Sequence, residues 1–186
     1  MLGIKTRIQR YLNGRKLTRN SCDINDSLKI IGKISVCNQG VLKIGKNALI
    51  RSGFDKNVLG GGKTKITVDT GAVLKIGDNV GISNTVIYCG KQITIGNDVM
   101  IGAGCLLMDS DCHSINYTDR IKMGDINVKM SPIVIDDGAF VGTRSIILKG
   151  VRIGKNAVVG AGSVVICDVP DNQVWSGNPA KFVKNI

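Results

Sequence analysis

Residues 135–170 read IDDGAF-VGTRSI-ILKGVR-IGKNAV-VGAGSV-VICDVP, the most regular stretch of the chain. An aliphatic residue stands at every sixth position, and a small or β-branched residue follows each one four positions later. The aliphatic set is Ile135, Val141, Ile147, Ile153, Val159 and Val165. The second set is Ala139, Ser145, Val151, Ala157, Ser163 and Val169. A six-residue period does not match the 3.6-residue turn of an α-helix, so the pattern favours short strands joined by turns.

The same pattern occurs upstream of this stretch. It covers Ile44–Ala48, Ile50–Phe54, Ile76–Val80, Ile82–Val86, Ile95–Val99 and Ile101–Cys105. Gly, Asn and Asp, which tolerate positive φ angles, fill the turns, as in 45–47 and 154–156. Three units close a triangular coil, and stacked coils pair their strands in parallel. We therefore predict an all-β solenoid over 21–170, held together by stacking of neighbouring coils.

Composition limits the alternatives. The 186 residues suffice for one domain, and 24 glycines without any Glu argue against a helical bundle. No apolar run reaches the length of a membrane span, and the N-terminus lacks the apolar core of a secretory signal, so a cytoplasmic location is expected. Six irregularly spaced cysteines and a single histidine predict neither a disulfide framework nor a metal site.

The net charge of +11 favours an anionic partner such as a phosphorylated cofactor. Nucleic acid is not expected, because the basic residues beyond 1–20 are scattered without interleaved aromatic residues. Residues 1–20 hold six basic and no acidic residues, and Ile4, Ile8, Tyr11 and Leu12 follow helical spacing. This basic amphipathic segment is predicted to form a helix that either caps the first coil or contacts a membrane surface peripherally.

Over about residues 28–186 the chain resembles the hexapeptide-repeat acyltransferases. That resemblance implies a left-handed parallel β-helix, with the handedness supplied by the family. Three motifs resemble the maltose/galactoside O-acetyltransferase branch, which includes capsular and exopolysaccharide O-acetyltransferases. They are Gly81-Ile82-Ser83-Asn84, Met108-Asp109-Ser110-Asp111-Cys112-His113 and Ser176-Gly177-Asn178-Pro179-Ala180-Lys181. The branch implies acetyl-CoA as the acetyl donor, a saccharide acceptor and a homotrimer with sites between subunits.

The repeat is interrupted at about residues 108–132, where a polar segment without hexads leaves the coil. His113, the only histidine, lies where this loop begins. From the residues alone, a solvated loop histidine explains it equally well. The resemblance implies that His113 is the general base that removes the proton of the acceptor hydroxyl. Asp109 or Asp111 could orient the ring or the sugar, or simply form the turn, and Asp111 is predicted to bind substrate.

Other site residues also come from the resemblance. Asn84 is predicted to contact the acceptor, with a plain turn residue as the alternative. Cys112 is considered as a nucleophile, but the family transfers the acetyl group directly, without a covalent intermediate. The contacts predicted for acetyl-CoA are Gly142, Thr143, Gly160 and Ala161 for the pantetheine arm, and Lys181 and Lys184 for the phosphates. The last two belong to a predicted C-terminal tail, residues 171–186.

These observations predict an acetyl-CoA-dependent O-acetyltransferase that acts on a sugar, a capsular glycan or a lipid-linked glycan and needs no metal. An N-acetyltransferase acting on an amino sugar stays open, because the same base and cofactor serve an amine. A non-catalytic solenoid that serves as an assembly module is the other alternative. The sequence does not identify the acceptor.

Overall fold

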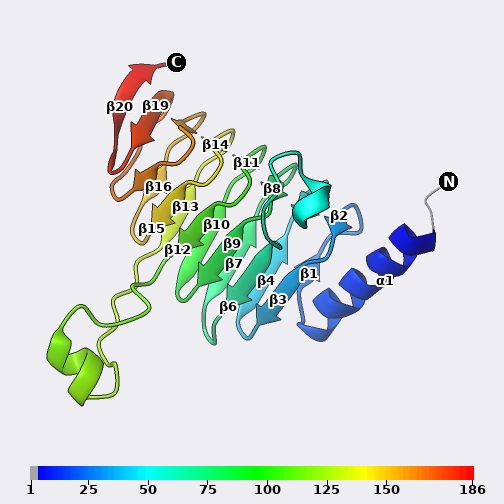
Figure 1. Cartoon of the computed structure of the whole chain (residues 1–186), viewed down its shortest axis with the longest axis horizontal. Coiled ribbons are helices and arrows are strands. Elements are labelled where there is room, and N and C mark those ends of the chain that lie inside the picture. The colour runs from blue at the N-terminus through cyan, green and yellow to red at the C-terminus, as the bar shows by residue number, and fades with distance from the viewer. Residues whose placement is uncertain (1–3) are drawn as a thin grey trace.

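The computed structural model describes residues 4–186, and their side chains from residue 8 onward. Short parallel strands stack into a three-sided column (Figure 1). Helix α1 (Ile4–Arg19) lies at one end of the column. An antiparallel hairpin of β19 (Gln173–Gly177) and β20 (Ala180–Asn185) extends the other end. This is the parallel β-helix that the six-residue repeat predicts.

Each side of the column is one sheet, and successive strands visit the three sheets in turn. Sheet A contains β1 (Asp23–Ile24), β4 (Val41–Ile44), β7 (Val73–Ile76), β10 (Gln92–Ile95), β13 (Ile133–Ile135) and β16 (Arg152–Ile153). Sheet B contains β2 (Lys29–Gly32), β5 (Leu49–Ser52), β8 (Gly81–Ser83), β11 (Met100–Ile101), β14 (Phe140–Val141), β17 (Val158–Val159), β19 and β20. Sheet C contains β3 (Ser35–Asn38), β6 (Lys65–Val68), β9 (Val86–Cys89), β12 (Leu106–Met108), β15 (Ile146–Leu148) and β18 (Val164–Val165).

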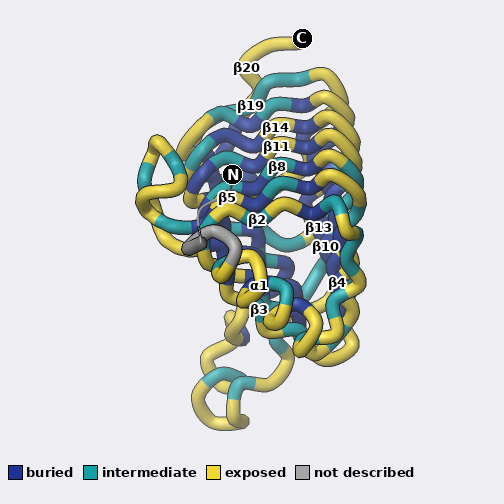
Figure 2. The backbone as a smooth tube through the Cα atoms, turned by 90° about the vertical axis from the view of Figure 1, so that its right-hand side faces the viewer, coloured by how far each residue is buried: buried dark blue, intermediate teal, exposed yellow. Residues whose placement is uncertain are grey.

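The aliphatic residues of the repeat lie in register inside the column. In sheet A the inner ladder is Ile44, Ile76, Ile95, Ile135 and Ile153, each at most 4% exposed. Equivalent ladders line sheets B and C, and Figure 2 shows the buried interior running the length of the column. Burial of apolar surface stabilises a fold by roughly 25 cal/mol per Å², and the side chains of these ladders are almost completely buried.

Polar turns link the coils along the edge between sheets A and B. Asn47, Asn79 and Asp98 have φ angles of +56°, +59° and +57°, as expected for turn residues of these types. Their side chains also connect neighbouring coils, because Asn47 donates to Asn79 at 3.2 Å and Asn79 donates to Asp98 at 2.9 Å. The turn residues therefore hold the stack as well as reversing the chain.

Helix α1 covers the first coil, but not with the residues that the sequence pattern suggests. Leu17 is 2% exposed, and Asn13 donates a 2.8 Å hydrogen bond to the Gly32 carbonyl. Ile8, Tyr11 and Leu12, by contrast, are 54%, 64% and 42% exposed, and the side chain of Ile4 lies outside the described set. The contact with the coil is therefore made by Asn13 and Leu17, and the predicted peripheral membrane contact stays a prediction.

The chain leaves the coil in two places. The 109–132 loop, between β12 and β13, lies on the edge between sheets C and A and projects far from the column (Figure 1). The 53–64 loop, between β5 and β6, lies on the edge between sheets B and C and includes a 3₁₀ turn at Phe54–Lys56. The sequence analysis identified only the first of them. No helix within residues 4–186 is long and apolar enough to cross a membrane.

Candidate active site

The predicted site residues lie on two different edges of the column. Asp109, Asp111 and His113 follow β12 on the edge between sheets C and A, which we call the His113 edge. The edge between sheets B and C, which we call the Asn84 edge, carries Asn84, Gly142, Thr143, Gly160 and Ala161. Sheet C separates the two groups. A single chain therefore does not bring the predicted base and the predicted acetyl-CoA contacts together.

Asp109 anchors the 109–132 loop to the preceding coil. Its carboxylate accepts hydrogen bonds from the backbone N–H groups of Gly90, Lys91 and Gln92 at 2.6, 2.9 and 2.7 Å. Asp109 is 0% exposed, so its charge is satisfied by these donors inside the turn. The residue is an anchor of the loop and does not orient the His113 ring.

Asp125 is the carboxylate that contacts His113. Its Oδ2 lies 2.5 Å from Nδ1 of His113, and its Oδ1 accepts a 2.8 Å hydrogen bond from the Ser114 N–H. The hydrogen bond from the Ser114 N–H lowers the pKa of Asp125 from its ordinary value, and the hydrogen bond with the His113 ring lowers it further. An ionised Asp125 favours the tautomer with hydrogen on Nδ1, which leaves the lone pair on Nε2. The His113 side chain is 71% exposed, so a substrate has access to the ring.

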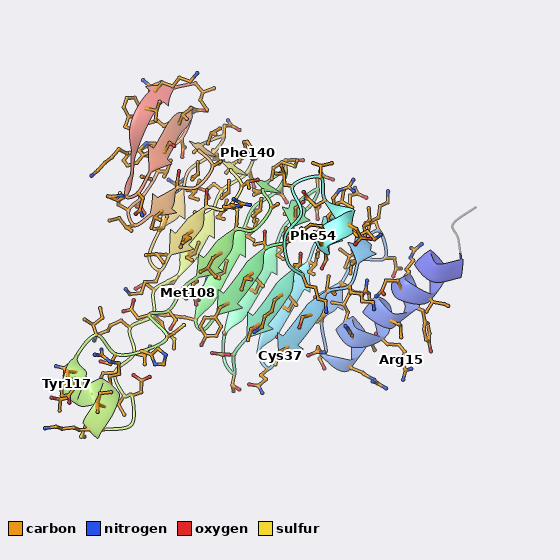
Figure 3. The ribbon with its side chains drawn as sticks, viewed as in Figure 1. Arg15, Cys37, Phe54, Met108, Tyr117 and Phe140 are labelled. Atoms are coloured by element: carbon orange, nitrogen blue, oxygen red, sulfur yellow. The ribbon has the colours of Figure 1, made fainter. Side chains whose placement is uncertain are left out.

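Sequence reasoning missed Asp125 for a physical reason. It lies twelve residues after His113, in a segment without a repeat, and nothing in its neighbours marks it. Only the path of the 109–132 loop, with Asp125 at a φ of +62°, brings the carboxylate back to the ring. Figure 3 shows Met108 at the root of this loop and Tyr117 within it.

Asp111 pairs with a lysine of the next coil. Its Oδ1 lies 2.6 Å from Nζ of Lys149, and its side chain is 19% exposed. The second oxygen, Oδ2, is buried without a hydrogen-bond partner among the described residues. Asp111 therefore does not orient the ring, and its contact with substrate stays a prediction.

The Cys112 thiol is exposed, but its surroundings do not activate it. Partial desolvation is the main cause that raises the pKa of this thiol, and neighbouring carboxylates, including Asp109 and Asp111, raise it further. The thiolate is the nucleophilic form of cysteine, so a raised pKa lowers the reactive fraction at neutral pH.

Asn84 holds the 53–64 loop at two points, Gly53 and Gly60. Its Oδ1 accepts a 2.8 Å hydrogen bond from the Gly53 N–H, and its Nδ2 donates to the Gly60 carbonyl at 2.5 Å. The residue is 3% exposed and has a φ of +45°. Both ends of the amide are thus engaged with the backbone, and Asn84 positions the loop whether or not it also meets an acceptor.

The small residues of the Asn84 edge are required by the spacing of the coils. A Cβ on Gly142 would lie 2.5 Å from the Ala161 nitrogen, and one on Gly160 would lie 2.5 Å from Oγ of Ser176. Both distances are too short for any side chain. Close packing thus explains these glycines, and their contact with acetyl-CoA stays a prediction.

The two predicted phosphate contacts lie on β20, beyond the last coil. Lys181 is opposite Ser176 and Lys184 is opposite Val174, and both lysines are exposed. Because Ser176 contacts the turn at Gly160, Lys181 lies at the Asn84 edge, whereas Lys184 lies farther along sheet B. Among residues 4–186, no three histidine, cysteine or aspartate side chains form a group able to hold a metal ion.

Comparison with known proteins agrees with this architecture. A family model described as the hexapeptide repeat of succinyl-transferase matches residues 132–167. The galactoside O-acetyltransferase of Lactococcus lactis is 33% identical over 144 residues, which cover 77% of this chain and 63% of that protein. The chain belongs to the hexapeptide-repeat acyltransferase family. WbbJ of Escherichia coli K12, which is named for lipopolysaccharide O-acetylation, is 29% identical to this chain. The match covers 79% of this chain and 73% of WbbJ.

A solved structure shows the hexapeptide-repeat fold as well. It is a mutant of AntD, an N-acyltransferase from Bacillus cereus, in complex with dTDP-4-amino-4,6-dideoxyglucose and coenzyme A. It matches with a TM-score of 0.74 at 23% identity, covering 92% of this chain and 88% of AntD. The chain spans only 63% of the length of the galactoside O-acetyltransferase and 59% of a second curated relative, from Saccharomyces cerevisiae.

Proposed function

We propose that this protein transfers the acetyl group of acetyl-CoA to a hydroxyl group of a saccharide, with His113 as the general base. The observation that carries the proposal is the exposed His113 ring held through Nδ1 by Asp125 at 2.5 Å. Family membership and the O-acetyltransferase names of two relatives support the reaction class.

The proposed reaction follows from the tautomer of His113. Acetyl-CoA supplies a thioester whose carbonyl carbon accepts the hydroxyl oxygen and whose C–S bond then breaks. Nε2 of His113 takes the hydroxyl proton as the new C–O bond forms, and later returns it to the departing thiolate sulfur. Asp125 stabilises the imidazolium between these steps and keeps the ring oriented. General-base catalysis of this kind contributes typically ~10²–10⁴ in rate.

We further propose that three copies assemble around the outer face of sheet C. Outward positions in its last four strands are all apolar or aromatic: Val86, Tyr88, Leu106, Met108, Ile146, Leu148 and Val164. The outer face of sheet A, by contrast, includes Lys43, Lys75 and Arg152. Sheet C borders the His113 edge on one side and the Asn84 edge on the other. If the sheet C faces of three copies surround a threefold axis, the His113 edge of one copy therefore lies beside the Asn84 edge of the next.

An acetyl-transfer assay tests the proposed reaction. Purified protein is incubated with acetyl-CoA and a panel of free, phosphorylated and nucleotide-linked saccharides that includes amino sugars, and the released thiol is measured. We expect an acetyl ester on a saccharide hydroxyl. His113→Ala should lower the rate by ~10²–10⁴ while melting temperature and acetyl-CoA binding persist.

Cys112→Ala is the matched control, because it changes the neighbouring residue of the same turn. We expect it to keep most of the activity, since direct transfer needs no acetylated thiol. A stoichiometric acetyl group on Cys112 in mass spectra of enzyme mixed with acetyl-CoA alone would overturn the mechanism, and so would a fully active His113→Ala variant.

A further inference from the structure

The Asn84 edge contains a cavity that no step of the proposed reaction uses. It lies between α1, β2 and the 53–64 loop, with a volume of about 650 Å³. Ligand pockets typically have volumes of ~300–1,000 Å³, so this cavity has room for a small molecule. Its walls combine apolar residues such as Ile30 and Ile31 with the backbone of the loop and three lysines.

The charged groups of this cavity favour an anion. Lys33, Lys56 and Lys63 line it, and the single acidic lining residue is Asp55. Lys56 is paired with Asp55 at 2.6 Å, whereas neither Lys33 nor Lys63 forms an ion pair with any described residue. Two lysines without a carboxylate partner beside one cavity create a positive potential that attracts a phosphate group.

The glycines of the 53–64 loop leave room for a ligand to approach the loop backbone closely. Gly61 has a φ of +108°, and a Cβ there would lie 3.0 Å from Nδ2 of Asn84, so this position needs glycine. A Cβ on Gly62 would meet only open space. Backbone N–H groups that no side chain covers are available to an anionic ligand. Because Asn84 bonds to the loop at Gly53 and at Gly60, this part of the cavity wall is held in place before any ligand arrives.

Phe54 adds an aromatic surface. It lines the cavity, its side chain is 78% exposed, and Figure 3 shows it on the 53–64 loop, apart from the protruding 109–132 loop. An aromatic ring next to a cationic cavity provides an apolar face for a sugar ring or a base, while the lysines bind the phosphates.

We propose that this cavity binds the phosphate or diphosphate group of a phosphorylated saccharide, which is the acceptor. This inference rests on the proposed function, because the cavity shares the edge that would meet the His113 of a neighbouring copy. The same chemistry occurs in a nucleoside diphosphate sugar and in a saccharide linked to a lipid through a diphosphate. In either source the anion would be held by Lys33 and Lys63, and the sugar would extend along the Asn84 edge.

Calorimetric titration tests the cavity without any acetyl transfer. We expect uridine diphosphate and inorganic pyrophosphate to bind the intact protein, with affinity that falls as sodium chloride rises, and neutral uridine to bind far more weakly. Lys33→Gln combined with Lys63→Gln should raise the Kd for uridine diphosphate about tenfold or more. Lys29→Gln combined with Lys65→Gln removes the same charge from exposed positions outside the cavity and should leave the Kd unchanged.

The outcomes separate this inference from the proposed function. Equal weakening by both double variants, or no binding of either diphosphate, overturns the cavity assignment even if unphosphorylated saccharides are acetylated. Diphosphate binding that depends on Lys33 and Lys63 supports the cavity even if no saccharide is acetylated, a result that overturns only the proposed reaction. Acetylation of a uridine diphosphate sugar, compared with a prenyl diphosphate sugar in micelles, distinguishes the two sources.

Discussion

The 109–132 loop and the 53–64 loop interrupt the same repeat, and each is tied down by one buried polar side chain of the coil. Asp109, 0% exposed, anchors the first loop through three backbone N–H groups. Asn84, 3% exposed, anchors the second loop through one N–H and one carbonyl. The resemblance predicts that Asn84 contacts the acceptor, and Asp109 is considered for orienting the His113 ring or the sugar. In the structure both buried side chains position the backbone of a loop, and the contact of Asn84 with an acceptor stays a prediction.

What the loops expose is different. The first presents an imidazole held by a carboxylate, a group suited to proton transfer. The second presents lysines, an aromatic ring and glycines, a set suited to anion binding. A surface suited to proton transfer and a surface suited to anion binding thus occupy separate edges of one chain, with the outer face of sheet C between them. The following changes test that division, beginning with the largest expected effect.

Ile146→Asp should break the proposed trimer and so separate the His113 edge of one copy from the Asn84 edge of the next. Ile146 faces outward from sheet C, between Leu106 and Val164, so a charge there would oppose burial against another copy. We expect a trimer to become a monomer by sedimentation velocity, with loss of nearly all acetyl transfer and an unchanged fold by circular dichroism.

Val134→Asp is the control for this prediction, because Val134 is an outward aliphatic residue of sheet A, beside Thr94 and Arg152. It should keep both the trimer and the activity. A wild-type protein that sediments as a monomer at micromolar concentration would contradict the arrangement of the two edges.

Asp125→Asn should weaken proton transfer without removing it. The amide keeps the shape of the side chain but lacks the charge that stabilises the imidazolium, so we expect kcat to fall about tenfold with KM little changed.

The charge that Asp125→Asn removes is present in the wild type. The pKa of Asp125 is lowered from the ordinary value, so the carboxylate stays charged through mildly acidic pH and becomes protonated only in stronger acid. An unchanged kcat in Asp125→Asn would show that Asp125 has only a structural role.

Lys181→Glu combined with Lys184→Glu should produce the smallest effect, because both side chains are exposed and screened by salt. We expect weaker binding of acetyl-CoA, by several-fold at low salt, with desphospho-CoA less affected. The control is Lys46→Glu combined with Lys75→Glu, at exposed positions distant from β20. Equal loss for acetyl-CoA and desphospho-CoA would contradict a contact with the phosphates.

The interior of the column could be predicted from the sequence alone. Ile135, Val141 and Ile147 recur at a spacing that only stacked short strands can bury, and all three are 0% exposed. His113 could also be singled out, because it is the only histidine and lies where the repeat stops. The interior residues recur at a fixed period, and His113 stands where that period stops, so both features can be recognised from residues nearby in the sequence.

The tertiary structure alone decided which side chains meet. Asp125 reaches His113 because of the path of an irregular loop. Lys33 and Lys63 line one cavity because the first coil lies beside a loop that the repeat does not predict. The placement of Asn84 and His113 on different edges follows from counting strands around the column, which the interrupted repeat obscures. Contacts between residues far apart in the chain depend on the number of turns between them, and no local pattern records that number.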